Sequence, residues 1–199
     1  MSSEGVNDGR RRFLTAATSA VGAAGAVGIL VPFVGSWNPS AKAKAAGAPV
    51  KQDISKLEPG QMINVEWRGK PVYVLHRTPE QVEALASIND QLKDPESTIE
   101  GSQPAYVSGI ARSIRPEILV IEGLCTHLGC APKFRPEVGV AEFGGDNWLG
   151  GFFCPCHGSL FDLSGRVYAG VPASKNLIVP PYSFEGDNIL VIGVDAEAA

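Results

Sequence analysis

Apolar and polar residues alternate in the part of the chain that follows residue 50. Residues 61–67 (QMINVEW) show this alternation, and residues 71–76 (PVYVLH) form a second apolar run. The intervening residues 68–70 (RGK) are typical of a tight turn. The pattern predicts a β-hairpin.

A helical signal follows this hairpin. Thr78 is a favourable N-cap, Pro79 suits the first helical turn, and apolar side chains recur on one face of residues 80–92. Residues 95–115 are polar and irregular, which favours a surface excursion. Apolar runs predict further strands at residues 118–121, 177–179 and 189–192, with a turn at residues 185–188.

Composition agrees with a fold built from strands and turns. The chain has 23 Gly and 15 Pro among 199 residues, a content that disfavours a helical bundle. We therefore predict an all-β fold, with antiparallel strands and one short helical insertion, over residues 51–199.

A long apolar stretch precedes this domain. Residues 13–37 carry no charge, and these 25 residues would span about 37 Å as a helix, against a bilayer core of about 30 Å. Arg10, Arg11 and Arg12 precede the stretch, which places the N-terminus in the cytoplasm. We predict a cytoplasmic segment at residues 1–12 and a transmembrane anchor at residues 13–37.

Two other features bear on this N-terminal segment. The Arg-Arg-x-Phe-Leu pattern of residues 10–14 is similar to the twin-arginine export signal, a route that carries folded cargo. A cleaved signal is the alternative, because Ala41-Lys42-Ala43 resembles a cleavage site, although the apolar run is longer than such signals have. Residues 38–50 are rich in Ala, Gly and Pro and predict a flexible hinge or a marginal helix.

Charge divides the chain at the same place. The first 50 residues carry a net charge of +3, and the remainder carries −7. An acidic body argues against a nucleic-acid partner, because nucleic-acid binders present basic surfaces to phosphates.

Candidate chemistry is concentrated in two short motifs. They are Cys125-Thr126-His127-Leu128-Gly129-Cys130 and Cys154-Pro155-Cys156-His157-Gly158-Ser159, which hold all four Cys and two of the three His. The third, His76, stands alone in a strand pattern, and we expect it to be structural or exposed.

Several metal and disulfide sites can be compared with this spacing. Structural zinc sites use C-x₂₋₄-C pairs, and plant-type [2Fe–2S] sites need four Cys with a C-x-x-C pair. The C-x-H and C-x-C-H spacings of this chain fit both poorly. An attached haem needs C-x-x-C-H, one residue more than residues 154–157 provide. Disulfides alone would leave the two His unexplained. The pattern favours a centre with one Cys and one His from each motif, and leaves zinc or disulfides as alternatives.

The two motifs together resemble the Rieske iron–sulfur subunit of quinol–cytochrome c oxidoreductases, the cytochrome bc complexes. The resemblance extends from the twin-arginine start to the Gly170-Val171-Pro172-Ala173 segment. It implies an all-β, Rieske-type antiparallel domain with a small cluster-binding subdomain, whose loops lie within residues 122–173, and one [2Fe–2S] cluster. It also implies Cys125 and Cys154 on one iron, His127 and His157 on the other, and a disulfide between Cys130 and Cys156.

The resemblance also implies a function. The chain would be the electron-transfer subunit, taking an electron and, through His157, a proton from quinol, and passing the electron to cytochrome c1. His127 would be the second exposed histidine ligand. The expected partners are cytochrome b, cytochrome c1 and ubiquinol or another quinol, in a dimeric complex of the bacterial inner membrane. The globular domain would lie on the periplasmic side and swing on the hinge at residues 38–50.

Four residues near the motifs are expected to tune or shield the cluster. Leu128 and Pro172 resemble apolar positions that cover it, and Ser159 resembles a hydroxyl that donates to a bridging sulfide and raises the reduction potential. Many family members carry Tyr where this chain has Phe161. The missing donor predicts a lower potential here, because a hydrogen bond to a negatively charged sulfur favours reduction.

Related proteins with other activities share parts of this pattern. One alternative is an exported Rieske subunit of a soluble periplasmic oxidoreductase such as arsenite oxidase, whose signal would be cleaved. The Rieske module of an aromatic-ring oxygenase, or its ferredoxin, usually lacks the two additional cysteines. A purely structural role is a third possibility, and it would require the absence of an iron–sulfur signal.

Overall fold

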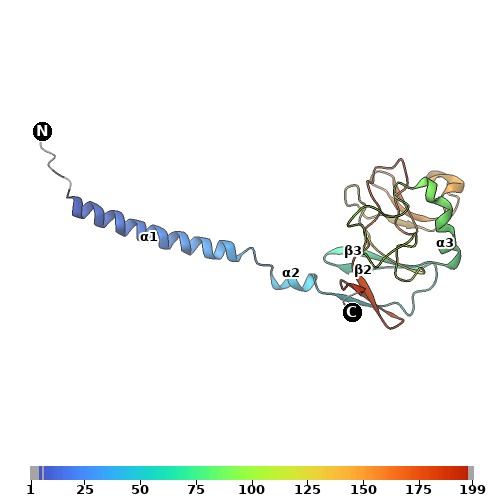
Figure 1. The fold of residues 1–199 in the computed structure, drawn as a ribbon, viewed down its shortest axis with the longest axis horizontal. Coiled ribbons are helices and arrows are strands. Elements are labelled where there is room, and N and C mark those ends of the chain that lie inside the picture. The colour runs from blue at the N-terminus through green and yellow to red at the C-terminus, as the bar shows by residue number, and fades with distance from the viewer. Residues whose placement is uncertain (1–4, 6, 197–199) are drawn as a thin grey trace. The chain divides into compact units, whose positions relative to one another are not determined.

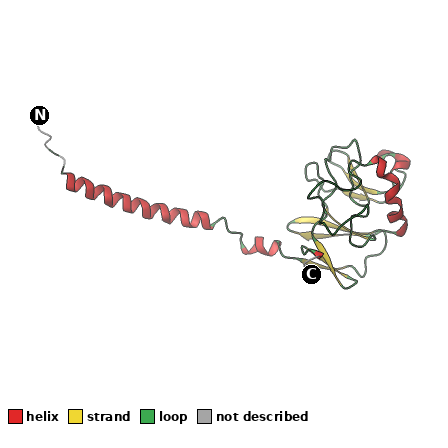
Figure 2. Ribbon diagram, viewed as in Figure 1, coloured by secondary structure: helices red, strands yellow, loops and turns green. Residues whose placement is uncertain are grey.

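The computed structural model describes residue 5 and residues 7–196 and divides into two compact units, residues 1–45 and 46–199. Residues 1–4 and 6 of the predicted cytoplasmic segment, and residues 197–199 of the predicted domain, lie outside the described residues. The first unit consists mainly of helix α1 (Asp8–Gly35), which Figures 1 and 2 show as one unbroken helix. The short helix α2 (Ala41–Ala46) falls in the stretch predicted as hinge or marginal helix.

Helix α1 covers most of the stretch predicted to cross the membrane. It starts five residues earlier than that stretch and so includes the three arginines. The side chain of Asn7 caps it by accepting a hydrogen bond from the Arg10 amide at 3.1 Å. None of its side chains is buried against protein, and the helix is long and apolar enough to cross a bilayer.

The second unit is built from three antiparallel sheets of three strands each, drawn in yellow in Figure 2. The first sheet has the order β1 (Val50–Asp53), β9 (Ile189–Ile192), β8 (Tyr182–Glu185). The second has the order β2 (Met62–Trp67), β3 (Lys70–His76), β4 (Ile118–Glu122). The third, which carries the second cluster motif, has the order β5 (Lys133–Arg135), β6 (Gly151–Cys154), β7 (Ser159–Asp162).

The sheet β2–β3–β4 forms the centre of the hydrophobic core. The hairpin predicted at residues 61–76 is confirmed, and Arg68 and Gly69 at its turn both have positive φ (52° and 70°). Strands β3 and β4 contribute fully buried apolar side chains, among them Val72, Val74, Leu75, Leu119, Val120 and Ile121. The first cluster motif begins at Cys125, shortly after β4 ends at Glu122, so the buried strand provides a rigid base for it.

The predicted helix after this hairpin is confirmed at its start and different at its end. Thr78 and Gln81 form a capping box, and α3 (Pro79–Ala84) then changes to a 3₁₀ helix, η1 (Leu85–Gln91). The buried Leu85 and Ile88 are three residues apart, which is the repeat of a 3₁₀ helix and places both on one face.

A second, smaller apolar cluster lies under this insertion. It joins the insertion to two further 3₁₀ helices, η2 (Ala141–Phe143) and η3 (Gly145–Asn147), and consists of Ile88, Leu92, Phe143, Trp148 and Tyr168.

The strand predicted at residues 177–179 is wrong. This stretch is mostly buried and forms no strand, and its backbone bonds go to three different segments. Leu177 N donates to Gly165 O, Ile178 O accepts from Glu122 N, and Val179 N donates to Ser102 O. With no single neighbour, the stretch cannot form a ladder. The strands at residues 118–121 and 189–192 are confirmed.

A buried ion pair fixes the chain just after β7. Asp162 and Arg166 are both buried, and the Asp162 carboxylate accepts from Arg166 Nε at 2.8 Å. The same carboxylate accepts from the amides of Ser164 (2.9 Å) and Arg166 (2.7 Å). Arg166 also donates to Leu85 O, so the pair ties the third sheet to the helical insertion.

Candidate metal centre

The two cysteines predicted as ligands lie at the ends of buried strands. Cys125 follows β4 and is 3% exposed, and Cys154 is the last residue of β6 and is 2% exposed. Both are free thiols. The hydrophobic core therefore fixes the position of Cys125, and the third sheet fixes that of Cys154.

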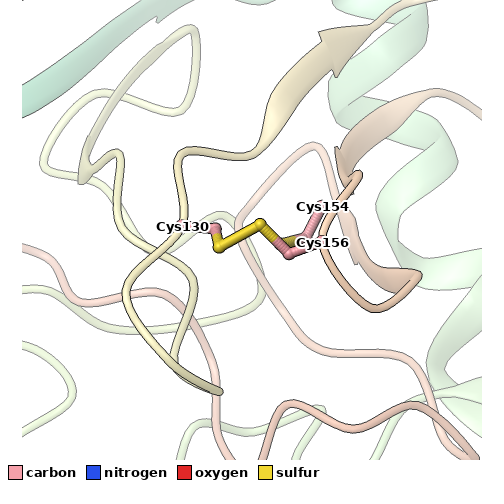
Figure 3. Close-up of side chains that lie close together, drawn as sticks. All are labelled: Cys130, Cys154 and Cys156. Carbon is pink, nitrogen blue, oxygen red and sulfur yellow. A yellow bond between two sulfur atoms is a disulfide. The ribbon is translucent and has the colours of Figure 1, made fainter.

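The other two cysteines are joined to each other. Cys130 and Cys156 form a disulfide, which links the two motifs with a Cα–Cα distance of 6.6 Å. Figure 3 shows this bond with the Cys154 side chain beside it. The sulfurs of these three residues lie within 4.8 Å of one another, but the disulfide removes two of them as metal ligands.

The two motifs turn in the same way after their free cysteine. Gly129 N donates to Cys125 O, and Gly158 N donates to Cys154 O, both at 2.9 Å. Each glycine lies four residues after its cysteine and has positive φ (82° and 75°), a conformation that favours glycine. The repeated turn gives Cys125 and Cys154 equivalent positions, as expected of two ligands of the same type.

The two predicted histidine ligands face each other. The rings of His127 and His157 are 4.8 Å apart between centroids and nearly perpendicular, with an interplanar angle of 85°. His127 is half-buried and His157 is exposed. His76 lies elsewhere, at the end of β3, with Nδ1 2.6 Å from Leu57 O, which agrees with a structural role.

Cys125 and Cys154 are buried beside each other, and this burial changes the acidity of the Cys125 thiol. Burial raises the pKa of the Cys125 thiol, and the adjacent Cys154 raises it further. Hydrogen bonds from the His127 backbone and the Ser159 side chain lower the same pKa. A bound metal would hold the Cys125 thiol as a thiolate. Two thiolates and two neutral imidazoles are the donor set of a Rieske [2Fe–2S] centre, so the residues present fit this group.

The segment that contains Pro172, one of the two residues predicted to shield the cluster, is tied to both motifs. We call residues 170–175 the shielding segment. Ala173 N donates to Ser159 Oγ at 3.0 Å, and the Thr126 hydroxyl donates to Lys175 O. Within this arrangement Pro172 is exposed, and Leu128 is 71% exposed. Shielding of the cluster by these two side chains stays a prediction.

The remaining tuning position lies on β7. The side chain of Phe161 is fully buried and faces Phe152 across the hairpin. Ser159, at the start of the same strand, is 1% exposed.

Two residues of this site have no signal in the sequence. Thr126 holds the shielding segment through Lys175 O, and Lys93 Nζ donates to Val171 O and Ala173 O. These contacts join residues 49, 78 and 80 positions apart and are made to backbone carbonyls. Motif spacing cannot reveal such partners, because a carbonyl belongs to every residue type.

Family models match two parts of the chain. Residues 1–40 match "Ubiquitinol-cytochrome C reductase Fe-S subunit TAT signal", and residues 91–183 match "Rieske [2Fe-2S] domain". The first match agrees with the predicted twin-arginine signal. The second contains both cluster motifs and agrees with the predicted cofactor, a [2Fe–2S] cluster.

Curated relatives match nearly the whole chain. The ubiquinol-cytochrome c reductase iron-sulfur subunit of Allochromatium vinosum is 56% identical over 199 residues, which is 100% of this chain and 95% of the relative. The protein of the same name from Bradyrhizobium diazoefficiens is 43% identical over 92% of this chain and 94% of its own length. The mitochondrial "Cytochrome b-c1 complex subunit Rieske" of Schizosaccharomyces pombe is 41% identical over 86% of this chain and 66% of its own length. The chain therefore belongs to the family of ubiquinol–cytochrome c reductase Rieske iron–sulfur subunits.

Proposed function

We propose that the chain is the electron-transferring subunit of a quinol–cytochrome c oxidoreductase, the cytochrome bc1 complex. The observation that carries this proposal is the 56% identity, over the full 199 residues, with a ubiquinol–cytochrome c reductase iron–sulfur subunit. When bound, a [2Fe–2S] cluster supplies one-electron chemistry, so that electrons from quinol reach cytochrome c1 one at a time.

The chain's own residues would divide the work of holding this cluster. Cys125 and Cys154 bind one iron, and His127 and His157 bind the other. The proposal is supported by the two free buried thiols, by the facing imidazoles, and by the disulfide that occupies the other two cysteines. The glycine turns after Cys125 and Cys154 hold both ligand loops in place.

His157 is the residue proposed to contact quinol. Its side chain is exposed at the tip of the β6–β7 turn, whereas the thiols behind it are buried. The ring nitrogen that does not bind metal can accept a hydrogen bond from the quinol hydroxyl and then hold its proton. Neutral imidazole ligands also raise the reduction potential above that of an all-thiolate site.

The proposed partners and location follow from the same family. The chain would assemble with cytochrome b and cytochrome c1 in a dimeric complex that oxidises ubiquinol or another quinol. A twin-arginine signal and an apolar helix fit an exported, membrane-anchored subunit. We place the anchor in the bacterial inner membrane and the β domain on the periplasmic side, with residues 38–50 as a hinge between them. The alternative of a soluble oxidoreductase subunit such as that of arsenite oxidase gains no support from these relatives.

The proposal is tested by electron paramagnetic resonance of membranes that contain the chain and its companion subunits. During redox titration we expect a Rieske-type signal whose shape changes when a quinol-site inhibitor is added. Replacement His157→Ala should abolish both this signal and quinol–cytochrome c turnover. The matched control His76→Ala should retain both, because the His76 side chain lies outside both cluster motifs and its hydrogen bond within the described residues is to Leu57 O. A spectrum without a Rieske signal, or full turnover in His157→Ala, would contradict the proposal.

A further inference from the structure

A lysine outside both cluster motifs reaches the shielding segment. Lys93 Nζ donates to Val171 O and to Ala173 O, both at 2.6 Å. These are the carbonyls on either side of Pro172. One ammonium group therefore joins both flanks of Pro172 and fixes the bend between them.

The backbone before the shielding segment brings Lys93 to this position. Lys93 N donates to Val167 O at 3.0 Å, and Ala169 N donates to Gln91 O at 2.7 Å. Leu92 and Tyr168 form an isolated antiparallel bridge between these two bonds. Residues 91–93 thus pair with residues 167–169, and the Lys93 side chain needs only to reach over the residues that follow.

Ala173 passes this restraint on to the cluster motif. Its carbonyl accepts from Lys93, and its amide donates to Ser159 Oγ at 3.0 Å. Ala173 and Ser159 are both buried, at 0% and 1% exposure. Because the Ser159 oxygen accepts from Ala173, its single hydrogen is left to donate to another group.

We propose that Lys93 is a positioning residue, which clamps the shielding segment through Val171 O and Ala173 O and so orients the Ser159 hydroxyl toward the cluster sulfur. The orientation toward a cluster rests on the proposed function; the clamp itself does not. An ammonium group suits this task, because it offers three donors and no acceptor and its hydrogen bonds to carbonyls are assisted by charge.

The clamp is tested by hydrogen exchange on the full-length chain, purified in detergent with its cluster. The variant Lys93→Met keeps the length of the side chain and removes the donors. We expect amide exchange in residues 167–177 to become about tenfold faster, while exchange in β3 and β4 stays unchanged. Lys93→Arg should restore slow exchange, because a guanidinium group can also donate to two carbonyls.

A second lysine provides the matched control. Lys133 is an exposed residue of the third sheet, and within the described residues its side chain makes no hydrogen bond or ion pair. Lys133→Met removes the same charge and should leave exchange in residues 167–177 unchanged. Exchange in Lys93→Met equal to that of the unmodified chain, or equally faster exchange in Lys133→Met, would overturn the clamp.

The reduction potential tests the effect on Ser159. A less restrained hydroxyl is a weaker donor, so the midpoint potential should fall in Lys93→Met, recover in Lys93→Arg and stay unchanged in Lys133→Met. An unchanged potential in Lys93→Met would overturn the link to Ser159. The exchange measurement does not depend on which residues bind the cluster. Unchanged exchange would therefore contradict the clamp alone, whereas the absence of a Rieske signal would contradict the proposed function.

Discussion

Phe161 is the buried residue at which this chain departs from many members of its family. Its ring is fully buried on β7, two residues after Ser159, and it faces Phe152 across the hairpin. A tyrosine at this position would add one hydroxyl close to the cluster motif. Because the position is fully buried, that hydroxyl would need a hydrogen-bond acceptor. The acceptor that the family resemblance implies is a ligand sulfur.

We predict that Phe161→Tyr raises the midpoint potential of the cluster. A hydrogen bond to a sulfur stabilises the more negative, reduced state; a tenfold preference for that state would raise the potential by about 60 mV. Redox titration followed by electron paramagnetic resonance measures the shift. Phe153→Tyr is the control and should leave the potential unchanged. Phe153 is next to Phe152, the cross-strand partner of Phe161, so its side chain points to the opposite face of the sheet. An unchanged midpoint potential in Phe161→Tyr would show that the absence of a tyrosine hydroxyl does not lower the potential of this cluster.

Asp162 is the residue on which the segment after β7 depends most. Its carboxylate balances Arg166 in a site where both side chains are 0–1% exposed, and Arg112 and Arg77 lie buried nearby. Burial lowers the pKa of Arg112 to about 10, so this group is still charged at neutral pH. The region holds more buried positive than negative charge, which makes the single carboxylate of Asp162 costly to lose.

We predict that Asp162→Asn destabilises the domain by about 3–5 kcal/mol, because it leaves the Arg166 guanidinium buried without a counter-charge. Thermal unfolding followed by circular dichroism measures the change. Glu185→Gln, which breaks the exposed pair with Lys51, should cost no more than about 1 kcal/mol. Equal stabilities of the two variants would contradict this account of the buried pair.

At the scale of elements, two loops from different sheets have to meet around one metal centre. The first loop leaves β4 of the second sheet, and the second joins β6 to β7 of the third. The glycine turns shape each loop separately, and the two loops meet through the Cys130–Cys156 disulfide and the His127 and His157 rings. The disulfide therefore holds the two loops close together, and with them the ends of β4 and β6.

We predict that the double variant Cys130→Ala, Cys156→Ala loses about 2–4 kcal/mol of stability, the range expected for a disulfide that closes a loop of this kind. It should also lose its cluster faster, because the two ligand pairs are no longer joined. Unfolding and the decay of the visible circular dichroism of the cluster in excess chelator measure both effects. A variant that keeps its cluster as long as the unmodified chain would show that the sheets alone hold the loops together.

At the scale of the whole molecule, the chain combines an apolar helix with a folded β domain. The helix α1 buries none of its side chains, and its apolar residues, such as Val21, Val27 and Ile29, are more than half exposed. Such a surface fits a lipid environment, since exposed apolar area of this extent is unfavourable in water. A retained membrane anchor satisfies this requirement, and cleavage near residue 41 would remove it.

We predict that the chain stays in the membrane fraction after alkaline carbonate washing and keeps its N-terminal segment. Val27→Arg should release part of the chain, because a charge near the centre of a membrane helix costs about 2.5–3.5 kcal/mol on insertion scales. Val27→Leu is the matched control and should remain bound. Recovery of the unmodified chain in the wash, shortened at residues 41–43, would favour a cleaved signal instead.

The sequence by itself determined the elements that depend on local chemistry. The hairpin at residues 61–76 and the helix start at Thr78 follow from alternation, turn residues and capping, which act between residues close in the chain. The family and its two cluster motifs were also recognisable, because ligand types and spacing are properties of the sequence. The apolar helix was predictable for the same reason, since its length and lack of charge are local.

Only the tertiary structure decided how distant segments meet. It gave residues 177–179 three separate backbone partners in place of a ladder, and it brought His127 to His157 and Cys130 to Cys156. It also brought Lys93 onto the two carbonyls beside Pro172. The family resemblance had implied the histidine and cysteine pairs. The hydrogen bonds of residues 177–179 and of Lys93 join distant segments through backbone groups, which leave no mark on residue type, so no local pattern could have revealed them.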